Sequence, residues 1–152
     1  MIDVKTLKKS VYGKKVLIDS NIIIYLTEKI EPYCQFSREL LAAIEEGKSN
    51  GVISILSVSE VMQGPLRAGK TEAAMAVKNY LMNFPNMICQ QISAEVLDLV
   101  GLDERILWRT LRIADSLIVA SGLQAGADLY ISNDNHFLKS LPRAMVLCPG
   151  QD

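Results

Sequence analysis

The stretch KVLIDSNIIIYLTE, residues 15–28, contains an apolar run, an acidic residue directly after it, and a second apolar run. Residues 15–18 are few, rich in β-branched side chains and flanked by polar residues, which predicts a strand buried on both faces. The apolar residues of 20–28 are spaced so that a helix starting there would place most of them against a sheet. Asp19 would then stand at the carboxyl end of the strand, in a strand-to-helix turn.

The rest of the chain continues this alternation of short apolar runs and helical patterns. Ser57 followed three residues later by Glu60 matches a capping box, which predicts that Glu60 lies in the first turn of a helix. Pro65 and the pair Gly69-Lys70 divide the following stretch into two helices. The other predicted elements are a helix at 34–46, a strand at 51–56, the helical pair within 58–84, a strand at 87–92, a helix at 93–100, an apolar helix at 113–124, and strands at 128–132 and 145–147.

Strands that alternate with helices throughout predict an α/β fold, arranged as a three-layer α/β/α sandwich around a mainly parallel central sheet. The chain has 152 residues and shows no repeat or linker-like segment, so we expect one domain over residues 1–152. Hydrophobic residues make up 49% and charged residues 22% of the sequence, which is typical of a globular protein.

Charge and hydropathy exclude several classes of protein. With 16 basic and 17 acidic side chains the formal net charge is -1, so any RNA binding must be local rather than driven by bulk positive charge. No apolar run approaches the roughly 20 residues of a membrane-spanning helix, and the start MIDVKTLKKS lacks the core of a signal peptide, which predicts a cytoplasmic protein without a membrane partner. Cys34, Cys89 and Cys148 form no zinc-ligand pattern and are expected to be reduced packing residues.

Four acidic residues follow predicted strands or begin predicted helices: Asp19, Glu60, Asp115 and Asp134. Ligands of open parallel sheets bind beyond the carboxyl ends of the strands, so these carboxylates are expected to share one cleft. Two carboxylates 4 Å apart repel by about 4 kcal/mol at an effective dielectric of about 20, so such a cluster requires a cation or protonation. Oxygen-only ligands suit Mg2+ or Mn2+ and argue against zinc.

Each of these acids also has a purely structural explanation. Asp19 and Asp134 would cap the helices that follow them, Glu60 would pair with Ser57, and Asp115 would cap a helix that starts one residue later. For any one residue alone, capping is the simpler interpretation. The joint arrangement of all four favours a shared site.

Four segments occur in an order that resembles the acidic motifs of a known family: VLIDSN at 16–21, SVSEV at 57–61, ADSLIVA at 114–120 and ISNDNHF at 131–137. Together they resemble PIN domains, especially VapC-like toxins, and they span nearly the whole chain. The resemblance implies a PIN fold and a metal-dependent endoribonuclease. It also implies that the four acids bind Mg2+ or Mn2+ and are catalytic.

The resemblance extends to two polar residues beside the acids. Asn21 and Ser132 match positions that hydrogen-bond to the acids and so orient them. Ser132 stands where many relatives carry Thr, and it keeps the hydroxyl. The implied reaction is hydrolysis of RNA phosphodiester bonds, with water activated at one or two ions.

The resemblance also suggests the toxin of a type II toxin-antitoxin pair, with an antitoxin protein as partner. Apolar side chains suited to a groove for a partner helix, which core packing explains equally well, are Val61, Met62, Leu66, Met75, Tyr80 and Met82. A homodimer and the RNA target are left open.

Two other functions remain as alternatives. One is a catalytically silent PIN-like module that only binds RNA or protein, against which the presence of all four acids argues. The other is a haloacid-dehalogenase-like phosphatase, which wants a second Asp at the position of Asn21. We interpret His136 as a partly exposed residue after a turn. The basic residues near the last two motifs are solvated surface or contacts to RNA phosphates: Arg109, Arg112, Lys139 and Arg143.

Overall fold

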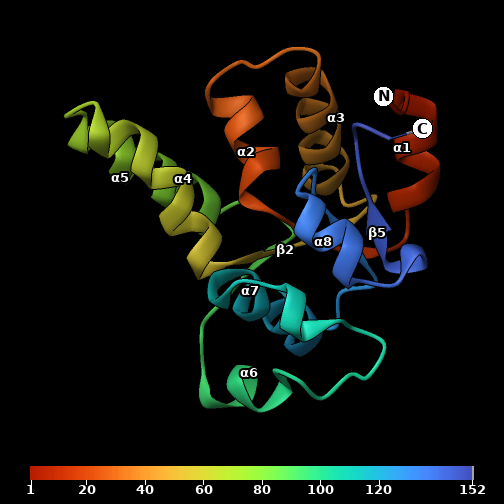
Figure 1. Cartoon of the computed structure of the whole chain (residues 1–152). Helices are drawn as coiled ribbons and strands as arrows, with labels where there is room; N and C mark the ends of the chain where they lie inside the picture. Colours follow the sequence, from red (N-terminus) through yellow and green to blue (C-terminus); the bar gives the residue numbers. More distant parts are fainter. Residues whose placement is uncertain (152) are drawn as a thin grey trace.

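A five-stranded parallel sheet forms the middle layer of the computed structural model, which describes residues 1–151 (Figure 1). The strand order is β3-β2-β1-β4-β5, and every pairing is parallel. The strands are β1 Lys15–Ile18, β2 Asn50–Ser54, β3 Met87–Gln90, β4 Leu129–Ile131 and β5 Val146–Leu147. The central strand β1 has the predicted bounds, and its apolar residues are fully buried, as expected for a strand covered on both faces.

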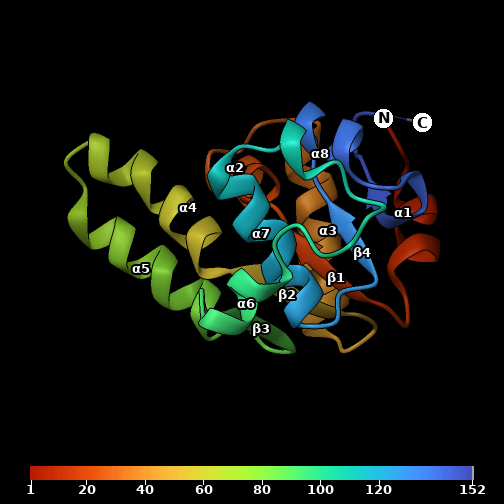
Figure 2. The same ribbon diagram turned by 60° about the horizontal axis from the view of Figure 1, so that its bottom comes forward.

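Helices cover both faces of the sheet, so the predicted three-layer α/β/α architecture is confirmed (Figures 1 and 2). The helices are α1 Val4–Val11, α2 Ser20–Thr27, α3 Tyr33–Glu45, α4 Ile55–Arg67, α5 Thr71–Met82, α6 Ala94–Leu99, α7 Ile113–Gln124 and α8 Asn135–Ser140, with 3-10 turns at Trp108–Thr110 and Arg143–Met145. Successive residues of β1 face opposite layers. Val16 and Ile18 pack with α1, α2 and α3, whereas Leu17 packs with α7 and α8.

The predicted capping box at Ser57 and Glu60 is wrong, because the helix begins three residues earlier. Ser54 ends β2 in an extended conformation, and its hydroxyl accepts a hydrogen bond from the Leu56 amide at 3.3 Å, which makes Ser54 the N-cap of α4. Ser57 is therefore inside the helix and buried, and its hydroxyl lacks a hydrogen-bond partner among residues 1–151. Glu60 lies in the second turn of α4, not in the first.

Helices α4 and α5 form a hairpin that extends away from the sheet (Figures 1 and 2). The prediction of two helices in this stretch is confirmed, but Pro65 does not separate them, since it lies inside α4. The separation falls at residues 68–70, where Gly69 has φ +72°, a left-handed conformation that glycine adopts without strain.

Helix α1 has no counterpart among the predicted elements. Asp3 caps it by accepting a hydrogen bond from the Thr6 amide at 2.7 Å, and Leu7 and Val11 bury its inner face. Among residues 1–151, no helix is long and apolar enough to cross a membrane. The cysteines are unpaired, as predicted.

The chain order of the strands explains where a site can form. From β1 the chain moves to β2 and β3 on one side and then returns to β4 on the other side. The junction of β1 and β4 is therefore the topological switch point, beyond which a crevice opens at the carboxyl ends of the strands. Asp19 directly follows β1 and Asp134 follows β4, so both flank this crevice.

Candidate metal and active site

The turn between β1 and α2 holds Asp19 almost completely out of solvent, with 4% of its surface exposed. One carboxylate oxygen accepts a hydrogen bond from the Ser20 amide at 2.8 Å, so Asp19 does cap α2. The other oxygen accepts from the Ser132 hydroxyl at 2.6 Å and from the Asn21 amide at 3.1 Å. Capping of α2 uses only one oxygen of Asp19, and the second oxygen contacts Ser132 and Asn21 instead.

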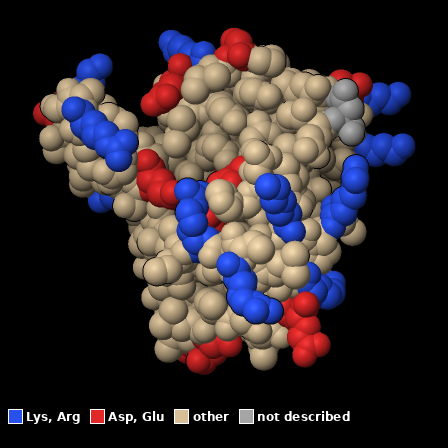
Figure 3. Space-filling view, viewed as in Figure 1, with Lys and Arg blue, Asp and Glu red and all other residues tan. Residues whose placement is uncertain are grey.

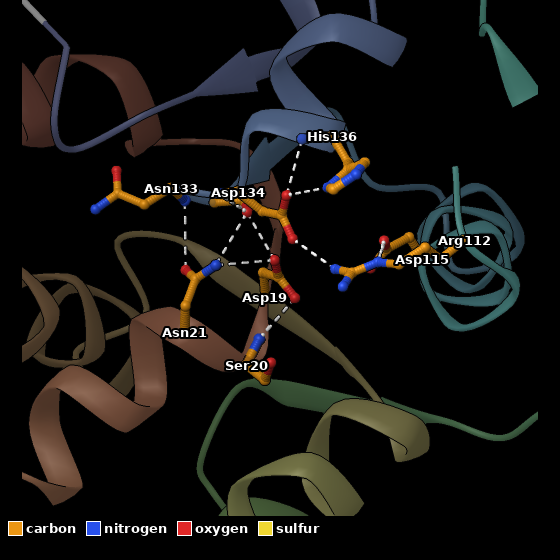
Figure 4. A network of polar contacts seen from close by, with 9 residues as sticks. Asp19, Ser20, Asn21, Arg112, Asp115, Asn133, Asp134 and His136 are labelled. Atoms are coloured by element: carbon orange, nitrogen blue, oxygen red, sulfur yellow. Dashed lines mark hydrogen bonds and ion pairs between the residues drawn. The ribbon is translucent and has the colours of Figure 1, made fainter. Parts of the chain in front are cut away.

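Ser132 and Asn21 both hydrogen-bond to Asp19, and Figure 4 shows the side chain of Asn21 beside Asp19. The Ser132 hydroxyl donates to Asp19 and accepts from the backbone amide of Asp134 at 2.9 Å. The side-chain oxygen Oδ1 of Asn21 accepts a hydrogen bond from the backbone amide of Asn133 at 3.3 Å. These bonds tie the loop after β1 to the loop after β4, and so set the position of Asp19 relative to Asp134.

Removal of the Ser132 hydroxyl tests this link. We expect Ser132→Ala to lower metal affinity by about 10- to 100-fold, the usual cost of losing a hydrogen bond that orients a metal ligand. Ser132→Thr keeps the hydroxyl and should retain the affinity. Isothermal titration with Mn2+ measures both. Equal losses in the two variants would mean that the hydroxyl is not the cause.

Asp134 and Asp115 are joined by one arginine. Asp134 caps α8, and one of its oxygens accepts from the backbone amide of His136 at 2.8 Å and contacts the ring Nδ1 of His136 at 2.9 Å. The other oxygen accepts from Nη2 of Arg112 at 3.0 Å, while Nε of Arg112 donates to Asp115 at 2.9 Å. Asp115 is buried and is the third residue of α7, so the interpretation of Asp115 as a helix cap is wrong.

Glu60 is exposed on the second turn of α4. Partial burial raises the pKa of Glu60; hydrogen bonding with Ser20 opposes the rise, and the charge of Asp115 adds to it. Asp134 raises the same pKa further, so Glu60 is close enough to interact with two of the other acids. Figure 3 shows acidic side chains near the centre of this face with basic side chains close beside them.

Burial raises the pKa of Asp19 to about 6. The hydrogen bonds from Ser132 and from the Ser20 amide lower it, whereas the charges of Glu60 and Asp115 raise it. Charge thus couples Asp19 with Glu60 and Asp115, and Glu60 with Asp115 and Asp134. Burial and mutual repulsion both disfavour the empty, fully ionised cluster, and a cation would offset both.

The residues present fit a divalent ion. Asp115, Asp134 and His136 each offer one ligand atom, and these atoms lie within 4.8 Å of one another. Carboxylate oxygens are the ligands that Mg2+ and Mn2+ prefer. His136 is exposed, as predicted, but its contact with Asp134 was missed. The sequence does place His136 two residues after Asp134, the N-cap of α8, and a side chain at that position of the first turn lies beside the cap.

The raised pKa of Asp19 has a measurable consequence. A carboxylate binds a metal ion in its deprotonated form, and Asp19 is largely protonated below its pKa of about 6. We therefore expect Mn2+ affinity to rise from pH 5 to pH 7 and to level off above that range, with protons released on binding at the acidic end. Titrations in buffers of different ionisation enthalpy measure the protons released. An affinity independent of pH over this range would contradict the role of Asp19.

The fold and the site together define a parallel three-layer α/β domain with an acidic, metal-compatible cleft at its topological switch point. The family model of the PIN domain matches residues 16–140. The chain belongs to the PIN domain family.

Solved structures show the same fold at low sequence identity. A chain of VapBC2 from Rickettsia felis, solved with a DNA fragment from its promoter, has a TM-score of 0.62 and 17% identity, covering 88% of this chain and 98% of that one. A chain of DNA-bound VapBC from Salmonella typhimurium has a TM-score of 0.63 and 15% identity, covering 89% and 98%. VapC20 from Mycobacterium tuberculosis, a Sarcin-Ricin loop cleaving toxin, has a TM-score of 0.59 and 16% identity, covering 82% and 93%. No curated protein matches the sequence.

Proposed function

We propose that the chain is a Mg2+- or Mn2+-dependent endoribonuclease whose metal-binding and catalytic residues are Asp19, Glu60, Asp115 and Asp134. One observation carries the proposal: the buried Asp19 carboxylate, with its raised pKa, is coupled to Glu60 and Asp115 across the cleft. Such a cluster is costly to maintain for structural reasons alone. Helix capping does not explain two of the four acids. Asp115 is not the N-cap of α7, and Glu60 lies in the second turn of α4.

The protein residues divide the work of phosphodiester hydrolysis. A divalent ion in the cleft would offset the negative charge that develops on the phosphate. Asn21 and Ser132 hold the Asp19 carboxylate in one orientation. Glu60 is exposed and has a raised pKa, so it is placed to take up a proton from the attacking water. The choice of RNA as substrate is supported by the family and by the description of VapC20 as a loop-cleaving toxin.

The proposal includes a role as the toxin of a toxin-antitoxin pair in the cytoplasm. Its support is that similar folds occur in VapBC structures and in a toxin-antitoxin complex from Klebsiella pneumoniae. Of the side chains expected to form a partner groove, Val61 is buried and Met62 is half-buried. The exposed ones lie on the α4–α5 hairpin: Leu66, Met75, Tyr80 and Met82. A hollow of about 340 Å³ lies between this hairpin and the end of α2.

The alternatives are less well supported by the contacts. A phosphatase of the haloacid-dehalogenase kind needs a carboxylate two residues after the first Asp, and here the Asn21 amide occupies that place and donates to Asp19. A silent binding module would have no need for Ser132 to position a buried carboxylate. The nuclease proposal uses both features.

The test is a cleavage assay on purified protein with mixed RNA. The wild type should cleave RNA with Mn2+ or Mg2+ and should stop when EDTA removes the ion. Asp115→Asn keeps the size of the side chain but removes a charge, and should lose the metal-dependent cleavage. If the wild type shows no cleavage above that of Asp115→Asn, the protein is a binding module.

A further inference from the structure

Arg112 lies at the mouth of the acidic cleft and bridges two of its carboxylates. Its Nε is 2.9 Å from Asp115 and its Nη2 is 3.0 Å from Asp134. The arginine side chain is 64% exposed, whereas the Asp115 side chain is 7% exposed. Figure 4 shows the guanidinium of Arg112, the residue before α7, extending toward Asp134. One exposed cation therefore neutralises two acids from α7 and from the loop after β4.

The guanidinium uses the oxygens that a metal ion would need. Both oxygens of Asp134 already accept hydrogen bonds, one from His136 and the other from Arg112. The same two aspartates and His136 form the group whose ligand atoms lie within 4.8 Å of one another. A divalent ion bound to these oxygens would lie beside the positively charged guanidinium, which repels it and already takes up one lone pair of each oxygen. Arg112 and a divalent ion therefore compete for this end of the cleft.

We infer that Arg112 is a counter-cation that competes with a divalent ion for Asp115 and Asp134, and that the guanidinium displaced by the ion binds a backbone phosphate of the RNA. This inference rests on the proposed nuclease function. Ion pairs of a solvent-exposed arginine are weak, so a divalent ion displaces the guanidinium at small cost. The planar guanidinium matches two phosphate oxygens, which makes it a better phosphate ligand than lysine. A chain of net charge -1 also needs local cations to hold RNA beside four acids.

Two substitutions provide matched comparisons. Arg109 lies three residues before Arg112, is exposed, and forms no ion pair among residues 1–151, so Arg109→Gln removes the same charge without touching the acids. Arg112→Lys keeps the charge but offers a single ammonium group, which cannot replace the Nε and Nη2 contacts together.

The experiment measures Mn2+ binding by isothermal titration without RNA, and then the kinetics of RNA cleavage at saturating Mn2+. We expect Arg112→Gln to bind Mn2+ about three- to tenfold more tightly than the wild type, because the guanidinium no longer competes for Asp115 and Asp134. The Mn2+ affinity of Arg112→Lys should lie between that of Arg112→Gln and that of the wild type. The Mn2+ affinity of Arg109→Gln should equal that of the wild type. At saturating Mn2+ the Arg112→Gln variant should show a KM for RNA raised severalfold with a smaller change in kcat, since a phosphate contact is present before and during the reaction.

Arg112→Gln is thus expected to strengthen Mn2+ binding and to weaken RNA binding. Loss of a purely structural ion pair would not change the two affinities in opposite directions. Unchanged or weaker Mn2+ binding by Arg112→Gln, or an unchanged KM, overturns the inference. If the inference is overturned but the wild type binds Mn2+ and cleaves RNA, the proposed nuclease function still stands. If neither the wild type nor Arg112→Gln binds Mn2+, the proposed function and the inference fail together. Far-UV circular dichroism confirms that each variant is folded.

Discussion

Asp19→Asn is expected to reduce Mn2+-dependent RNA cleavage on the order of a hundred- to a thousandfold, the range seen when a preorganised electrostatic group is lost from an active site. The substitution removes the charge at the switch point. It also places an amide opposite two donors, because Asn21 and Ser132 both donate to the same oxygen of Asp19. The new amide has one acceptor oxygen, so either the Ser20 amide or the pair Asn21 and Ser132 would face an N–H donor. Cleavage rates at saturating Mn2+ measure the loss.

Asp128→Asn is the matched control for this prediction. Asp128 directly precedes β4, at the opposite end of the sheet, is exposed, and accepts a hydrogen bond from the Lys15 amide at 2.9 Å. The chemical change is the same, but it lies away from the cleft, so the cleavage rate should stay at the wild-type value. A similar loss in both variants would show that the effect comes from the fold and not from the acidic site.

Gly122→Ala is expected to destabilise the protein by about 2–3 kcal/mol, the cost of overpacking a rigid core. Gly122 is buried in α7, and a Cβ there would lie 2.6 Å from ring atoms of Tyr130. The ring has little room to move, because Tyr130 is fully buried and its hydroxyl donates to the backbone oxygen of Val119 at 3.1 Å. Either α7 must shift away from β4 or the tyrosine must give up that hydrogen bond. Urea unfolding at equilibrium measures the change.

Gly64→Ala makes the same substitution inside another helix, where the expected effect has the opposite sign. Gly64 is exposed in α4, and a Cβ there would meet only the carboxylate end of Glu28, at 3.2 Å. That end belongs to a flexible side chain on the surface. The gain in helix propensity should therefore stabilise the protein by roughly 0.5–1 kcal/mol. Equal destabilisation by both substitutions would rule out the clash with Tyr130 as the cause at Gly122.

The start of α4 shows why helix boundaries could not be taken from sequence alone. Ser54 and Ser57 both precede helical patterns, and only Ser57 has a Glu three residues later. The structure selects Ser54, because the pairing of β2 with β3 extends to the partners Ser54 and Gln90 and ends there. The strand partner thus determines which serine is free to cap. This contact joins residues far apart in the chain, and no local pattern contains it.

Asn21 and Ser132 were predicted only from the resemblance to PIN domains. The sequence by itself determined the alternation of strands and helices and the bounds of β1 and α7, and it marked four acids at the ends of predicted strands and helices as candidates. It could do so because burial on both faces, helical periodicity and helix caps are encoded by near neighbours in the chain. Only the tertiary structure decided that Ser132 donates to Asp19, and that Arg112 spans Asp115 and Asp134. These contacts depend on how β1 and β4 lie side by side and on how α7 packs against the sheet, which is set by the complementary shapes of side chains distant in sequence.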